Sequence, residues 1–143
     1  MRRLTVKEVE YIAFKLAQKI LSFNEPIPNF STRFPNVLES CLAAPFQTFT
    51  ARSLYPGLIE KASVLFYFMI KNHPFQNGNK RIAMTTLLVL LYKNKRWLKA
   101  DTQELYNFTM WIAQSPPSFK EEALKAIQKF LKSHLVDLSK NKS

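Results

Sequence analysis

The chain has 143 residues, 47% of them hydrophobic and 22% charged, a composition that excludes intrinsic disorder. Lysine and arginine outnumber acidic residues by 21 to 10, and the net charge of +11 favours an acidic partner. A single cysteine, Cys41, excludes an internal disulfide, and an amphipathic helix in place of an apolar export segment predicts a cytoplasmic protein.

The first predicted element is an amphipathic helix that begins at Thr5. Thr5 and Glu8 form the T-x-x-E pattern of a capping box. Apolar residues then recur at spacings of three and four, which predicts one buried stripe of Val6, Val9, Ala13, Leu16 and Ile20. The prolines within residues 24–28 cannot continue this helix, so a loop is expected there.

A short second helix and a hairpin should follow. Pro35 suits a first helical turn, and Pro45 should end that helix. Cys41 lies among apolar residues at helical spacing, which indicates a buried side chain. Residues 46–55 alternate between apolar and polar types, so we expect a small hairpin there, in the one stretch with strand character.

Two long apolar helices are predicted in the middle of the chain. The third helix should cover residues 56–72, and its stretch 64–70 is apolar nearly all round, which predicts the central buried helix. This apolar stretch is too short to cross a bilayer, so no membrane association is expected. The fourth helix should run from residue 79 to about 92.

Two further helices complete the predicted fold. Asp101 with Glu104, and Ser118 with Glu121, are capping-box patterns that should start them. One face of the last helix should be buried, with Phe119, Leu124, Ile127, Leu131 and Leu135 on it. We expect one domain over residues 1–143, with its core at about 4–138 and a flexible C-terminal tail from residue 139.

A polar segment, HPFQNGNKR at residues 73–81, separates the two apolar helices. Gly78 permits a left-handed backbone, and the helix that follows directs its unpaired amides into the loop. Such amides favour phosphate, and an anionic ligand would offset the unfavourable place of Lys80 and Arg81 at a helix N-terminus. The pattern therefore indicates an anion site.

His73 is the imidazole beside this predicted anion site. A neutral imidazole can take the proton of a serine, threonine or tyrosine hydroxyl as that oxygen attacks phosphorus. The alternative is that His73 only caps the preceding helix. Phe75 is expected to fill the core and fix the path of the loop, and His134, which has no comparable polar cluster around it, is expected to be structural.

Residues 73–81 resemble the Fic motif, H-P-F-x-[D/E]-G-N-[G/K]-R, at every position except Asn77. The resemblance extends from Leu4 to about Leu135, with residues 46–55 in the place of the flap of Doc-like proteins. It implies an all-α fold: a single-domain Fic/Doc-like helical bundle with a small β-hairpin flap next to the active-site loop.

The resemblance also implies roles for individual residues, with ATP and magnesium bound at the loop. His73 would be the general base. The nucleotide phosphates would be held by Gly78, Asn79, Lys80 and Arg81. A segment of the target protein would dock like an added strand on the flap residues, Thr48, Phe49, Thr50, Ala51 and Arg52.

Lys80 stands where AMP-transferring members of the family have glycine and Doc toxins have lysine. The Doc-like reading implies a protein kinase that transfers the γ-phosphate of ATP, in a toxin-antitoxin system whose toxin is restrained by a cognate antitoxin. The family target, a threonine of elongation factor Tu, lies on an acidic protein, consistent with the +11 charge. Nucleic acid is not the expected partner, because most phenylalanines fall at core spacing.

Asn77 replaces the acid that binds metal in the family. Its carbonyl can coordinate magnesium but brings no negative charge. The alternatives are therefore attenuated activity, or an inactive nucleotide- or RNA-binding relic, and a Fic-type protein AMP-transferase that carries lysine stands beside the kinase. Residues 118–123 come close to the inhibitory-helix pattern of some Fic enzymes but depart at the last position, which favours control in trans.

Overall fold

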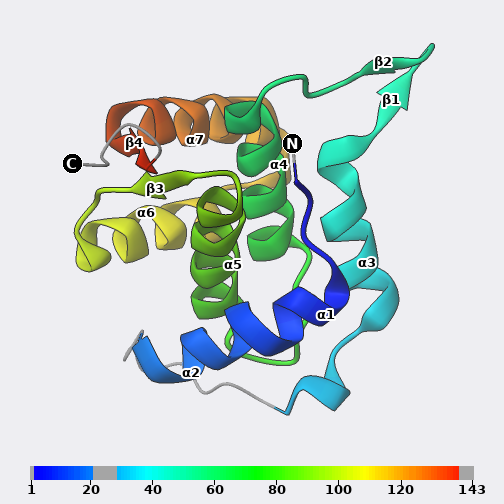
Figure 1. Cartoon of the computed structure of the whole chain (residues 1–143), viewed down its shortest axis with the longest axis vertical. Helices are drawn as coiled ribbons and strands as arrows, with labels where there is room; N and C mark the ends of the chain where they lie inside the picture. Colours follow the sequence, from blue (N-terminus) through cyan, green and yellow to red (C-terminus); the bar gives the residue numbers. More distant parts are fainter. Residues whose placement is uncertain (1, 21–28, 139–143) are drawn as a thin grey trace.

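The computed structural model describes residues 2–20 and 29–138, and helices dominate it, as predicted (Figure 1). Two antiparallel neighbours, α4 (Leu58–Lys71) and α5 (Asn79–Lys93), form its centre. The N-terminal helical run crosses α5, while α6 and α7 pack against α4 from the other side. The predicted loop at residues 24–28 and the predicted tail from residue 139 lie outside the described residues.

The N-terminal run is helical throughout but changes type, from α1 (Val6–Glu8) through a π-helical turn (Val9–Phe14) to α2 (Lys15–Ile20). The predicted capping box is confirmed: the Thr5 hydroxyl accepts from the Glu8 amide at 3.1 Å, and a Glu8 carboxylate oxygen accepts from the Thr5 amide at 3.0 Å.

The predicted apolar stripe of this run is confirmed only in part. Val9 is fully buried, but Leu16 is half-buried, and Ala17 takes the fully buried place beside it. Because a π-turn holds more residues than an α-turn, the buried face shifts along the sequence after it. The side chains of Ala13 and Ile20 lie outside the described residues.

The next segment packs on α4 as a short helical layer. A 3-10 turn (Phe30–Thr32) leads into α3 (Pro35–Ala43), with Pro35 in the first turn as predicted, and a second 3-10 turn (Ala44–Phe46) follows. Cys41 is 1% exposed, so its predicted burial is confirmed.

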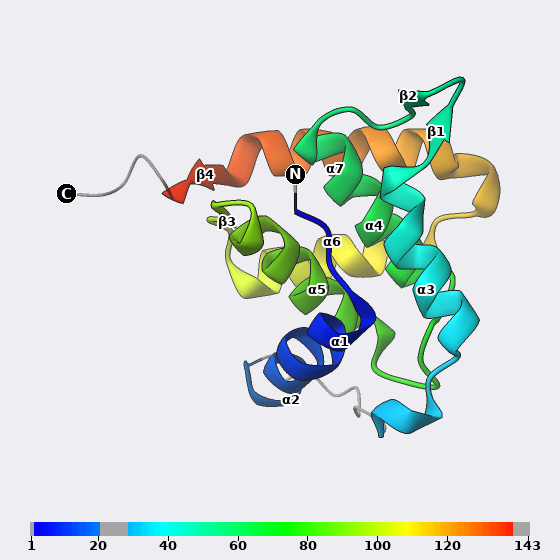
Figure 2. The same cartoon turned by 45° about the vertical axis from the view of Figure 1, so that its right-hand side comes forward.

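The predicted hairpin is present, as β1 (Thr48–Phe49) paired antiparallel with β2 (Arg52–Ser53). Its two turn residues both have positive φ, which the right-handed twist of a two-residue hairpin requires. Its predicted place next to the active-site loop is wrong. The hairpin projects from the N-terminal end of α4, whereas residues 73–78 follow its C-terminal end (Figures 1 and 2). The straight helix between them keeps the two apart.

The predicted central helices are confirmed. Within the apolar stretch 64–70 of α4 every side chain is buried except that of Phe68, which is half-buried. The buried apolar side chains of the described residues join in one cluster that includes Phe66, Met69, Ile82 and Leu90. Among the described residues, no helix is both long and apolar enough to cross a bilayer.

A second small sheet was not predicted and corrects the expectation that strands occur in one stretch alone. β3 (Arg96–Leu98) pairs antiparallel with β4 (Leu135–Asp137), and Leu98 and Leu135 are partners in it. This pairing ends the last helix at residue 134, so Leu135 lies in a strand and not on the predicted helical face.

The last two helices start differently. α6 (Thr102–Gln114) is capped by Asp101, whose carboxylate accepts from the Gln103 and Glu104 amides at 3.1 and 3.3 Å, as predicted. The predicted cap at Ser118 is wrong, because a 3-10 turn (Pro117–Phe119) includes that residue.

The last helix, α7, therefore begins only at Lys120 and ends at His134. Phe119 is the N-cap residue, makes no side-chain cap hydrogen bond, and is 47% exposed, outside the core, which corrects its predicted burial. The remaining predicted face is confirmed, since Leu124, Ile127 and Leu131 are buried.

Candidate functional site

His73 directly follows Asn72, the C-terminal cap residue of α4, and is exposed to solvent. Its φ of 50° lies in the left-handed region, which glycine usually occupies after a helix. A histidine in this conformation is disfavoured, and such residues cluster at functional sites. The surroundings of His73 therefore hold an imidazole outward at a conformational cost.

Phe75 anchors the loop in the core, as predicted. Its side chain is 1% exposed, and its ring lies 5.8 Å from that of Phe30. Beside it, the Pro74 carbonyl accepts from the Phe34 amide at 2.9 Å. The loop is thus fixed against the segment that leads into α3, and His73 is the exposed end of an anchored turn.

Asn79 ties the two ends of the loop together. Its Oδ1 accepts from the Phe75 amide at 3.0 Å, and its Nδ2 donates to the Phe75 carbonyl at 2.9 Å. These two bonds fix the orientation of the amide, so the group that lies 3.5 Å from Nδ1 of His73 is a donor. Nδ1 is then the acceptor, and in the neutral ring the proton is on Nε2.

Gly78 and Asn77 form the start of α5. Gly78 is the N-terminal cap with φ 72°, so the predicted left-handed glycine is confirmed. Asn77 Oδ1 accepts from the Gly78 amide at 2.9 Å. One lone pair of the predicted metal-binding oxygen is therefore already engaged within the loop.

A cavity of about 380 Å³, the site cavity, opens beside this loop. One wall is the motif itself, with His73, Gln76, Asn77, Gly78, Asn79 and Lys80. The opposite wall is mostly apolar and consists of Ile70, Tyr106, Met110 and Ala113. The predicted catalytic, phosphate-binding and metal-binding residues, with the exception of Arg81, therefore come together around one opening.

The apolar wall on α6 was missed from the sequence. Tyr106, Met110 and Ala113 recur at spacings of four and three, a signal that marked only a helix face. Nothing in that spacing distinguishes a face toward a cavity from a face toward the core. The packing of α6 on α4 and α5 determines which way this face is directed.

Arg81 lies elsewhere than the pattern suggested. It is 8% exposed, its guanidinium donates to the Ala17 carbonyl of α2, and it is not among the described residues that line the site cavity. The flap residues are all exposed and lie at the far end of α4. The structure thus leaves Arg81 and the hairpin apart from the other predicted residues, and it brings together His73, Asn77, Gly78, Asn79 and Lys80.

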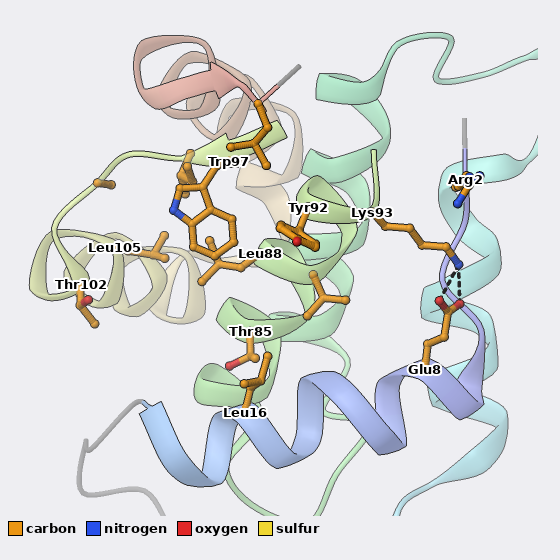
Figure 3. A pocket seen from close by; sticks show the side chains of 14 residues that line it. Arg2, Glu8, Leu16, Thr85, Leu88, Tyr92, Lys93, Trp97, Thr102 and Leu105 are labelled. Carbon is orange, nitrogen blue, oxygen red and sulfur yellow. Dashed lines mark hydrogen bonds and ion pairs between the residues drawn. The ribbon is translucent and has the colours of Figure 1, made fainter. Parts of the chain in front are cut away.

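A larger cavity of about 1020 Å³ is lined by residues of the N-terminal run, α5, β3 and α6 (Figure 3). Its lining is largely apolar and includes Leu16, Leu88, Tyr92, Trp97 and Leu105. At one end Lys93 binds both carboxylate oxygens of Glu8 at 2.6 Å. This cavity contains no residue of the motif, so its size does not make it the site of chemistry.

The side chains that line the site cavity would form a poor magnesium site by themselves. Magnesium prefers carboxylates and phosphate oxygens, and among the described residues that line the cavity none is acidic. Within the described ranges, no group of three or more histidine, cysteine, aspartate or glutamate side chains could hold a metal ion. Asn77 offers one neutral oxygen, so a metal would depend on the phosphates that arrive with it.

Comparison with protein families gives one match, to the Fic/DOC family, over residues 3–91. This span covers more than half of the chain and includes the whole motif, so the chain belongs to the Fic/DOC family. Members of the family are typically transferases. Comparisons with curated proteins and with solved structures give no match.

Proposed function

We propose that the chain is a Doc-like toxin that transfers the γ-phosphate of ATP to a hydroxyl of a protein. The observation that carries the proposal is the shared cavity: an exposed imidazole, a helix N-terminus with a left-handed glycine, and the Lys80 ammonium face one opening of about 380 Å³. Backbone amides at a helix start and a lysine are suited to a triphosphate.

In the proposed reaction the target hydroxyl oxygen attacks the γ-phosphorus while His73 takes its proton. The bond between the γ-phosphorus and the β,γ-bridging oxygen breaks, and ADP leaves with the electron pair. Lys80 stabilises the charge that develops on the phosphoryl oxygens. Magnesium, bound to the phosphates of ATP, would lower that charge further, with Asn77 as its predicted protein ligand. The base needs a free lone pair on its ring, so Nδ1 of His73 must give up its contact with the Asn79 amide before it can take the proton.

The remaining walls have proposed roles as well. Tyr106 and Met110 offer an apolar surface to the part of the nucleotide beyond its phosphates. A phosphate contact by Arg81 stays a prediction, since its guanidinium binds the Ala17 carbonyl in this structure. The target protein would dock on the exposed hairpin residues 48–52, remote from the hydroxyl that reacts.

The proposed target is elongation factor Tu, and a separate antitoxin is the proposed partner that restrains the toxin. The net charge of +11 supports an acidic target, because opposite charges speed association and stabilise the complex. The departure from the inhibitory-helix pattern at residues 118–123 supports control by another chain.

The experiment that tests this function uses ATP labelled in either the α- or the γ-phosphate, with purified elongation factor Tu and magnesium. Label reaching the target from the γ position supports the kinase. Label from the α position alone would show AMP transfer. ATP binding with no transfer from either position would favour the relic.

Asn77→Asp tests whether this residue attenuates the enzyme. A carboxylate adds the negative ligand that magnesium prefers, so we expect transfer to rise at least tenfold at low magnesium and the magnesium requirement to fall. Asn77→Ala is the matched control and should lower transfer. Equal rates for Asn77→Asp and the unsubstituted chain across a magnesium titration would contradict a metal role for this position.

A further inference from the structure

The hairpin has few contacts of its own. Every residue from 47 to 54 is exposed, and its ladder joins only Thr48 with Ser53 and Phe49 with Arg52. Two short strands are marginal in water, and the left-handed turn residues Thr50 and Ala51 disfavour the hairpin further. Its position must therefore depend on the contacts at its base.

Lys61 of α4 supplies those contacts on the returning strand. Its side chain is 7% exposed, and its Nζ donates to the Ser53 hydroxyl at 3.1 Å and to the Tyr55 carbonyl. Ser53 is the last residue of β2, and Tyr55 lies two residues further on. One ammonium group thus joins the end of the hairpin to α4, the helix that precedes the motif.

The same ammonium also contacts the outgoing side. The Phe46 ring, just before the hairpin, lies 5.6 Å from Lys61 Nζ and 4.2 Å from the Arg3 guanidinium carbon, so two cations face it. The Leu54 amide donates to the Gln47 carbonyl at 3.0 Å and closes the base. Both ends of the hairpin therefore converge on Lys61.

A buried ammonium is unfavourable unless its donors are satisfied. An apolar side chain would fill the space of the lysine stem equally well. The contacts that Lys61 makes at the base of the hairpin therefore account for a charged residue at this buried position. We propose that Lys61 is a positioning residue that fixes the orientation of the hairpin and, through it, the docking of the protein substrate. The docking part rests on the proposed function, in which the target binds the hairpin.

The place of the hairpin determines which kinetic constant should respond. α4 has 14 residues and separates hairpin from motif by about 21 Å. A segment docked on the hairpin therefore contacts the enzyme far from the reacting hydroxyl. Loss of Lys61 should weaken binding of the folded target and leave phosphoryl transfer from bound ATP unchanged.

Hydrogen exchange tests the anchor in the full chain without any ligand. Lys61→Met keeps the stem and removes the donors, so amides of residues 47–54 should exchange at least tenfold faster while those of α4 and α5 do not change. Phe46→Leu, which leaves Lys61 in place, should have a smaller effect in the same segment and serves if Lys61→Met does not fold. Lys120→Met is the matched control, because Lys120 Nζ lies 4.9 Å from the Phe68 ring and not at the hairpin.

Steady-state transfer to elongation factor Tu tests the docking role. Lys61→Met should raise KM for the target about tenfold, with kcat and KM for ATP within twofold, and Lys61→Arg should restore part of the loss because it retains donors and charge. Unchanged exchange in residues 47–54 would overturn the anchor. Faster exchange with an unchanged KM would overturn the docking role. If the unsubstituted chain transfers nothing, the proposed function fails, and the exchange experiment still decides the anchor.

Discussion

At the scale of single residues, His73 is the side chain on which the proposed chemistry depends. His73→Ala should lower transfer by about 10²–10⁴-fold, the usual contribution of a general base, because no other imidazole lines the described site cavity. ATP affinity, measured by calorimetry, should stay the same, since the phosphate contacts come from the start of α5.

The other histidine gives a matched control for this substitution. His134 lies on α7, with Nδ1 2.8 Å from the Phe130 carbonyl, outside the site cavity. His134→Ala should leave transfer intact in protein that remains folded by circular dichroism. Equal losses in the two variants would count against a catalytic role for His73.

Cys41 offers a test of packing at the residue scale. Burial raises the pKa of its thiol to about 11, and a weaker opposing effect comes from the Asn72 side chain. At pH 8 roughly one thiol in a thousand is then thiolate, the reactive form. A thiol reagent should therefore modify Cys41 only as the protein unfolds, at a rate that rises with urea. Rapid modification in native buffer would show that the packing of α3 on α4 does not cover this residue.

At the scale of elements, the capping box of the N-terminal run is linked to the end of α5. Burial tends to raise the pKa of Glu8, but hydrogen bonds and charge from Lys93, with hydrogen bonds from Thr5, outweigh it, and the net pKa is lowered from 4.5. A carboxylate with a lowered pKa stabilises the fold fully above its ordinary value. This stability is lost as the pH falls through the lowered value.

Glu8→Gln isolates this contribution. The variant should be less stable than the unsubstituted chain at pH 7, and the difference between the two should shrink as the pH falls below about 4.5, because the unfolded state then takes up a proton while folded Glu8 stays ionised until the pH reaches its lowered pKa. Urea midpoints at several pH values measure it. A difference that stays constant down to pH 2.5 would contradict the link between Glu8 and Lys93.

The elements also show what local sequence can and cannot predict. Caps at Thr5 and Asp101 were predictable because each depends on residues three positions away or nearer. The β3–β4 sheet was not, because it joins Arg96 to Asp137 across the last two helices through strands of three residues. The cap at Ser118 failed because two adjacent prolines impose a 3-10 turn before the helix.

The features of the candidate site likewise divide into those that local sequence predicts and those that it does not. The left-handed Gly78 and the buried Phe75 were predictable from the motif, since both are properties of the loop itself. The direction of Arg81 depends on the packing of α2, and the direction of the hairpin depends on Lys61. Neither contact leaves a mark in a periodic pattern, because one joins Arg81 to a carbonyl of α2 and the other joins Lys61 of α4 to a hydroxyl of the preceding hairpin.

At the scale of the whole molecule, the charge of +11 should govern association with the target. Raising sodium chloride from about 50 to about 300 mM shortens the range of electrostatic attraction, so KM for elongation factor Tu should rise several-fold. The control is kcat at saturating target and ATP, which should change little. A KM that does not depend on salt would leave the charge without a role in target binding.

The most direct measurement is a crystal structure of the chain with a non-hydrolysable ATP analogue and magnesium. The account predicts the triphosphate at the start of α5, with the terminal phosphate in hydrogen-bonding reach of Lys80. The gap between this phosphate and the His73 ring should have room for one hydroxyl group of the target. An analogue bound in the larger cavity, or with its α-phosphate beside His73, would contradict γ-phosphate transfer at this loop.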